Sequence, residues 1–200
     1  AGVRVPLEVR PQAVADDGDA QVIHQTHQVH DLLLCQELGL VHDDAGVLWQ
    51  FHEAQALWGD RITLRRGAEL GEAQLSFDRA DRLLAGEELD FVIGSVHLSG
   101  KKFANMDLYY IEKGSEAYYD SVIDSYLDDV LTLARWGRFQ VLGHLTLPLR
   151  YINEHHGEHM TFRRHMDRVE EIFRTIIPQG VGIECNTNRG NEPLPGEDIL

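Results

Sequence analysis

The chain is poor in the features that mark secreted and membrane-bound proteins. It has only two cysteines, Cys35 and Cys185, in 200 residues, too few for a disulfide framework, and this favours a reducing cytoplasm. Cys185 lies in an apolar strand pattern, so we expect a small core residue there. No apolar run approaches the roughly 18 residues of a membrane span. The N-terminus also lacks the charged-then-apolar pattern of a secretion signal, so we expect no membrane partner.

Positive charge, and lysine in particular, is also scarce. Lys and Arg number 18 against 33 Asp and Glu, which gives a formal net charge of −15, and only three of the basic residues are lysines. Because nucleic-acid backbones are bound by Lys and Arg that neutralise phosphates, this balance argues against a nucleic-acid partner. The length suits one domain with a sizeable core, but it is short of the about 250 residues of a complete eight-stranded β/α barrel.

Residues 1–50 differ in composition from the rest of the chain. They hold one of its sixteen aromatic residues, Trp49, and no lysine. Such a segment buries little large apolar surface, so we predict an atypical, poorly ordered segment at 1–50 and a domain at 51–200. His24, His27 and His30 are spaced by three, which would place them near one face of a helix. No apolar strand leads to them, and we interpret them as residues that do not bind a metal.

From about Phe51 the pattern alternates between strand and helix, which predicts an α/β fold with parallel pairing. The predicted strands cover residues 62–70, 90–97, 108–111, 139–144 and 181–186. The predicted helices cover residues 53–57, 76–84, 115–134 and 161–177.

Three of these strands lead to a residue that can bind a metal. Glu69, His97 and His144 stand at the ends of separate apolar runs. Because the C-terminal ends of parallel strands meet on one face, we expect the three side chains to converge there. Neutral imidazole with carboxylate suits zinc, iron or manganese. Arg150 and Arg189 are candidates for holding a phosphate through their guanidinium groups, with an exposed surface arginine as the alternative for each.

Two other groups of polar residues have simpler interpretations. The cluster His155-His156-Gly157-Glu158-His159 contains a helix-breaking glycine, and we predict a solvated loop there. Asp120, Asp124 and Asp128 recur at helical spacing opposite an apolar stripe, which predicts a solvated helix face rather than a cation site.

Four stretches carry a resemblance to a known family. They are Leu64-Arg65-Arg66-Gly67-Ala68-Glu69-Leu70-Gly71-Glu72, Asp90-Phe91-Val92-Ile93-Gly94-Ser95-Val96-His97, Val141-Leu142-Gly143-His144-Leu145-Thr146-Leu147-Pro148-Leu149-Arg150-Tyr151 and Gly182-Ile183-Glu184-Cys185-Asn186-Thr187-Asn188-Arg189-Gly190-Asn191. Over roughly residues 51–200 the chain resembles the PHP family of metal-dependent phosphoesterases, most closely its histidinol-phosphatase branch. The resemblance implies a partial distorted (β/α)7 PHP-type barrel with an atypical N-terminal segment.

The resemblance also implies roles for individual residues. Glu69 would be a metal-bridging carboxylate, His97 and His144 would be metal ligands, and Arg150 and Arg189 would bind the substrate phosphate. The family site holds two or three divalent ions. Many members have Asp where this chain has Thr146.

Two family motifs are missing from the pattern. The family opens on a His-x-His strand and closes on an Asp-x-His strand, and neither is recognisable here. His24-Gln25-Thr26-His27 has a different spacing, and we predict no strand there.

The implied activity is hydrolysis of the small phosphate ester L-histidinol phosphate to L-histidinol and phosphate, a late step of histidine biosynthesis. Because the flanking ligand motifs are missing, a catalytically inactive PHP fragment or pseudoenzyme is the alternative. A third option is a polymerase-associated exonuclease activity, which the acidic surface disfavours.

Overall fold

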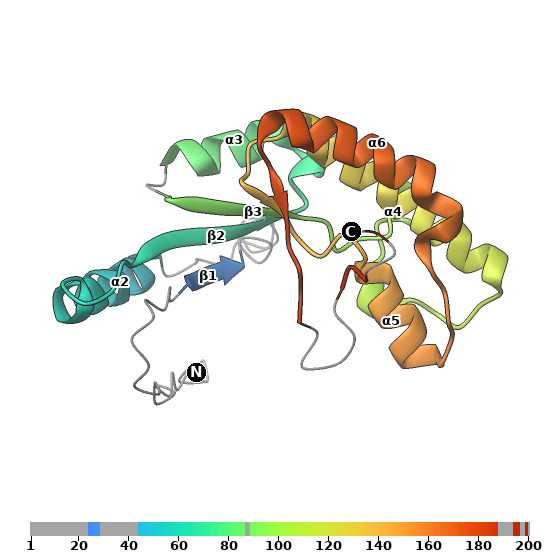
Figure 1. Cartoon of the computed structure of the whole chain (residues 1–200), viewed down its shortest axis with the longest axis horizontal. Coiled ribbons are helices and arrows are strands. Elements are labelled where there is room, and N and C mark those ends of the chain that lie inside the picture. The colour runs from blue at the N-terminus through green and yellow to red at the C-terminus, as the bar shows by residue number, and fades with distance from the viewer. Residues whose placement is uncertain (1–23, 29–43, 87–88, 188–193, 197–198, 200) are drawn as a thin grey trace, which may run out of the picture.

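The computed structural model describes residues 24–28, 44–86, 89–187, 194–196 and 199. At its centre is a parallel five-stranded sheet with strand order β1-β2-β3-β4-β5 (Figure 1). Sheet order therefore follows chain order. The strands are β1 (His24–Gln28), β2 (Arg65–Gly71), β3 (Phe91–Ser95), β4 (Val141–Leu142) and β5 (Gly182–Ile183).

Helices connect the parallel strands, as a β/α fold requires. Figure 1 shows α3, α4 and α6 along one side of the sheet, and α4 packs against both α6 and β3. The α-helices are α2 (Asp44–Trp58), α3 (Phe77–Gly86), α4 (Glu116–Trp136), α5 (Leu147–His156) and α6 (Met166–Ile176). Among the described segments, no helix combines the length and apolar character needed to cross a bilayer.

The long helix α4 supplies much of the core. Its first turn is capped by Ser115, whose hydroxyl accepts a hydrogen bond from the backbone N–H of Tyr118, and it ends at Gly137 in the left-handed conformation. Its predicted apolar stripe is buried, including Ile123 and Leu127. Burying a Leu or Ile side chain contributes about 1.5–3 kcal/mol. The helix is therefore held by its packing against the sheet and α6.

Several predicted elements differ from the structure. Residues predicted as a strand at 108–111 form a 3₁₀ turn, Leu108–Tyr110, whose first turn is capped by the Asp107 side chain. The predicted helix 161–177 is divided into a 3₁₀ turn, Phe162–His165, and α6. The later strands are shorter than predicted: β4 and β5 have only two residues each.

Two predictions about single residues were wrong. Cys185 is exposed, and it lies two residues beyond the end of β5 at Ile183 rather than inside a strand. The histidines at 155 and 156 belong to the last turn of α5 rather than to a loop, and Gly157 caps that helix. Pro148 occupies the first turn of α5, where a missing N–H costs nothing.

The strand β1 corrects the interpretation of His24-Gln25-Thr26-His27. These residues form a strand whose backbone pairs in parallel with β2, from His24 opposite Arg65 to Gln28 opposite Glu69. The segment contains no apolar residue, so it lacks the alternation by which a strand is recognised in a sequence.

Candidate metal centre

The predicted ligands Glu69, His97 and His144 lie together. Oε1 of Glu69 is 3.1 Å from Nε2 of His97 and 3.0 Å from Nε2 of His144. The two Nε2 atoms are 3.3 Å apart. All three side chains are mostly buried, with 13–19% of their surface exposed. The structure thus brings the three residues to one place, while their role as metal ligands stays a prediction.

The strand register explains why they meet. Glu69 in β2 pairs with Ile93 in β3, which in turn pairs with Val141 in β4. The chain therefore leaves β3 and β4 at the same level of the sheet, and His97 and His144 follow within two residues of each strand end.

Close packing beneath the histidines fixes these two loops. A Cβ atom on Gly143 would lie 2.5 Å from Oγ of Ser95 and 3.0 Å from Cγ2 of Ile93, so a larger residue there would displace these two side chains of β3. His144 itself has φ of +27°. A non-glycine residue in such a conformation costs on the order of 1–3 kcal/mol and is found mainly at functional sites.

The three ligand atoms fit a divalent metal ion. Zinc bonds to His nitrogen and carboxylate oxygen are about 2.0–2.1 Å long, so the ligand atoms of a tetrahedral site stand about 3.3–3.4 Å apart. The observed separations of 3.0, 3.1 and 3.3 Å are close to that spacing. One carboxylate and two imidazoles suit zinc, manganese or iron. These are the one group of three potential ligands that the described residues bring together.

The electrostatics of the three groups are linked. Burial disfavours a charged His97, but the hydrogen bonds and negative charges of Glu69 and Glu72 outweigh it and raise the pKa of His97 to about 10. Burial and the positive charge of His97 lower the pKa of His144. Burial would raise the pKa of Glu69, but its hydrogen bond with His97 and the charges of both histidines lower it. Without metal, the ring of His97 therefore carries a proton on both nitrogens at neutral pH, and its positive charge balances the nearby carboxylates.

The structure adds two carboxylates that the sequence analysis left without a role. Glu72 accepts a hydrogen bond from the backbone N–H of His97, at 2.5 Å, and contacts Nδ1 of its ring. Glu184 accepts from the backbone N–H of His144, at 2.9 Å. Both residues lie within the stretches quoted for the family resemblance, and their position in those stretches was the available signal. Tyr126 adds a hydrogen bond from its hydroxyl to the carbonyl of His144.

The two candidate arginines differ in what can be said of them. Arg150 lies in α5 and is partly exposed, and its positive charge contributes to lowering the pKa of His144. Its Nε atom is buried and has no hydrogen-bond partner among the described residues. Arg189 lies outside the described residues. Thr146, which stands where many family members have Asp, is buried.

The remaining polar clusters have structural roles. Nε2 of His156 lies 2.8 Å from the carbonyl of Ile111, which ties the end of α5 to the preceding loop. On α4, Asp124 is exposed as predicted, whereas Asp120 is mostly covered. Both carboxylates contact the buried ring of His165. These contacts join α4 to the segment that leads into α6.

A parallel β/α sheet that brings a carboxylate and two imidazoles together offers a group of potential metal ligands. The family model that matches the chain is the PHP domain, over residues 18–188. The chain belongs to the PHP-domain family. The match includes β1, whereas the resemblance visible in the sequence begins near residue 51.

Known relatives of this chain are named as histidinol phosphatases. A protein of Clostridium acetobutylicum named "Probable histidinol-phosphatase" is 25% identical over 135 residues, which are 67% of this chain and 51% of that protein. The chain thus spans about half the length of this relative.

Solved structures share the fold. The histidinol phosphate phosphatase of Lactococcus lactis, in complex with zinc, L-histidinol and phosphate, matches with a TM-score of 0.60 and 20% identity over 74% of this chain and 55% of that one. A Listeria monocytogenes protein assigned as a histidinol phosphatase matches with a TM-score of 0.61 and 15% identity, over 80% and 66% of the two chains. The five described strands and their helices are therefore part of a PHP-type barrel.

Proposed function

We propose that this chain carries the catalytic site of a metal-dependent phosphomonoesterase. The observation that carries the proposal is the triangle of Glu69, His97 and His144 at the strand ends of a PHP-domain fold. All three atoms that face one another are good ligands for divalent metals, and Arg150 stands close enough to influence His144.

Each residue has a distinct part in the proposed reaction. Glu69 offers one oxygen to the space between both histidine rings, and His97 and His144 offer Nε2 atoms. These three residues would hold a divalent ion, whose chemistry would be to polarise phosphoryl oxygens and to lower the pKa of water towards about 7. Arg150 binds the phosphate and offsets the negative charge that grows on its oxygens. Arg189 is proposed to bind the substrate phosphate as well, on the ground of the family resemblance alone.

The proposed substrate is L-histidinol phosphate, and the products are L-histidinol and inorganic phosphate. The support is the naming of the relatives in Clostridium and Lactococcus, together with the resemblance of the four stretches. The reaction would serve histidine biosynthesis.

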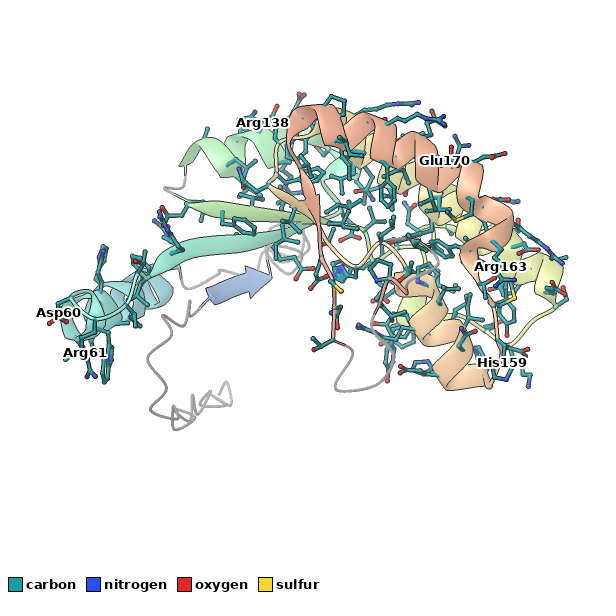
Figure 2. All side chains as sticks on the ribbon, in the orientation of Figure 1. Asp60, Arg61, Arg138, His159, Arg163 and Glu170 are labelled. Carbon is teal, nitrogen blue, oxygen red and sulfur yellow. The ribbon has the colours of Figure 1, made fainter. Side chains whose placement is uncertain are left out.

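The experiment is a phosphate-release assay on chelator-treated protein with L-histidinol phosphate, with and without added manganese or zinc. We expect metal-stimulated turnover that is lost in His97→Ala. His159→Ala is the matched control, because His159 is exposed and points to the periphery of the molecule (Figure 2). Equal turnover in wild type and His97→Ala would contradict the proposal.

A catalytically inactive PHP chain is the second candidate. It is favoured by one observation: the described residues bring together three potential ligands, whereas the family site holds two or three ions. Elemental analysis of purified protein separates the two functions. Two or three metals per chain support the phosphatase, and no bound metal with no turnover supports the inactive chain.

A further inference from the structure

Glu72 makes an unusual pair of contacts with a single residue. It is almost fully buried, with 4% of its surface exposed. Its Oε1 accepts from the backbone N–H of His97 at 2.5 Å, and its Oε2 lies 3.2 Å from Nδ1 of the same histidine. One carboxylate therefore contacts both the backbone N–H and the ring of His97.

These contacts give Glu72 a role different from that of Glu69. Both of its oxygens are directed to His97, whereas Glu69 uses its Oε1 to face both histidine Nε2 atoms. Among the described residues, Glu72 is also not in the group that could share a metal ion. We therefore exclude it as a direct ligand and ask what it does to the ring.

The contact with Glu72 favours a proton on Nδ1 of His97. A neutral imidazole carries its proton on either Nδ1 or Nε2, and an ionised carboxylate can only accept. The proton of His97 is therefore held on Nδ1, facing Glu72. Without metal, Nε2 carries a second proton that faces Oε1 of Glu69 at 3.1 Å and Nε2 of His144 at 3.3 Å. Loss of that proton on metal binding would leave the Nε2 lone pair aimed at the same place, with the other proton still on Nδ1. When the ring holds a single proton, the hydrogen bond to Glu72 favours the tautomer with that proton on Nδ1.

We propose that Glu72 is a positioning residue that locks His97 in the Nδ1–H tautomer and aims its Nε2 lone pair at the metal centre. The inference rests on the proposed function, because it concerns the same site. Carboxylate partners of metal-binding histidines commonly fix ring orientation in this way. The backbone of Glu72 is left-handed, with φ of +55°, which is unfavourable for a residue with a side chain. Such strain is often found where a side chain has to be held in one position for function.

The sharpest variant is Glu72→Gln, which has the same shape but one acceptor and one donor. The backbone N–H of His97 can only donate, so the amide oxygen must face it. The amide NH₂ then faces Nδ1, which must become the acceptor, and the ring proton moves to Nε2. A protonated Nε2 cannot bind metal. We expect zinc affinity to fall about 10–100-fold, the range found for outer partners of metal ligands.

Zinc affinity is measured by competition with a chromophoric chelator, with folding monitored by circular dichroism. Glu170→Gln is the control, because Glu170 is exposed on α6 and pairs with Arg174 (Figure 2). If Glu72→Gln does not fold, Glu72→Gly replaces it, because glycine adopts the left-handed backbone freely and removes both contacts. A folded variant that binds zinc as tightly as wild type overturns the proposal.

A second measurement observes the ring proton of His97 directly in the wild-type protein. Long-range ¹H–¹⁵N NMR of the zinc-loaded wild-type protein reports which ring nitrogen carries the proton, with His97 assigned by its absence in His97→Ala. We expect a proton on Nδ1 and zinc on Nε2, and the reverse overturns the proposal. Zinc binding without turnover would remove the proposed phosphatase alone. Turnover with an unaffected Glu72→Gln would remove the role of Glu72 alone. A wild-type chain that binds no zinc would remove both.

Discussion

Nε2 of His97 and Nε2 of His144 face each other at 3.3 Å, although the two residues are 47 positions apart in the chain. Two imidazole nitrogens at this distance cannot both present lone pairs without a proton or cation between them. In the absence of metal, the raised pKa of His97, about 10, and the lowered pKa of His144 mean that His97 carries this proton and His144 accepts it. A bound cation would take the place of the proton, so metal uptake should release protons.

Replacing His144 tests whether this residue is a metal ligand. We predict that His144→Asn lowers metal affinity and turnover by more than the roughly 10–100-fold typical of outer-shell partners. Asn is chosen because it tolerates a positive φ better than most residues, and φ at position 144 is +27°. Metal titration with phosphate-release assays measures both effects. His159→Asn should behave as wild type, and an unaffected His144→Asn would contradict the assignment of His144 as a ligand.

Arg150 is predicted to bind the phosphate. Hydrogen bonds to charged groups contribute about 1.5–3 kcal/mol, so Arg150→Gln should weaken inhibition by inorganic phosphate by about tenfold or more. The effect should appear in the inhibition constant for phosphate and in KM. Arg163→Gln is the control, since Arg163 is exposed and lies at the edge of the molecule (Figure 2). Equal inhibition of both variants would remove Arg150 from the substrate site.

The sequence predicted the convergence of the ligands because it depends on one rule of topology. In a parallel sheet, strand ends gather on one face, so three strand-end residues meet even when strand lengths are misjudged. β4 is two residues long rather than six, yet His144 still reaches Glu69.

The carboxylates that support the histidines could not be predicted in the same way. Glu72 and Glu184 act through hydrogen bonds to the backbone N–H groups of residues on neighbouring segments. Such bonds depend on register and on loop conformation, including a left-handed φ at Glu72. Neither the register nor the loop conformation can be recognised from the spacing of apolar residues in the sequence. β1 escaped prediction for a related reason, because its residues are all polar and its pairing with β2 is made by the backbone.

The packing of Gly94 in β3 leads to a prediction about stability. A Cβ atom on this residue would lie 2.7 Å from the ring of Phe139, which is buried. Overpacking of this kind typically costs about 1–3 kcal/mol, so Gly94→Ala should lower the free energy of unfolding by that amount. Urea unfolding measures it. Gly86→Ala is the control, because a Cβ atom on Gly86 meets nothing within 4 Å. A Gly94→Ala protein as stable as Gly86→Ala would show that Phe139 can move aside.

Asp90 links the stability of the sheet to pH. Its Oδ2 accepts from the backbone N–H of Arg66 at 2.8 Å, at the start of the β2–β3 pairing. That hydrogen bond, together with Arg65, lowers the pKa of Asp90 below its usual value. The folded protein therefore favours the ionised carboxylate. Its contribution to stability is complete above the unfolded pKa of about 3.9 and is lost as the pH falls through the lower folded pKa.

We therefore predict that Asp90→Asn is less stable than wild type at neutral pH and that the difference shrinks below about pH 4. Because Asp90 is solvent-exposed, the effect should be small and should weaken in high salt. Urea unfolding midpoints at several pH values between neutral and acidic conditions measure the trend. Asp60→Asn serves as the comparison, because Asp60 is exposed at the far end of the molecule beside α2 (Figure 2). A difference between wild type and Asp90→Asn that stays constant on acidification would mean that the carboxylate charge is not what holds this end of β2 to β3.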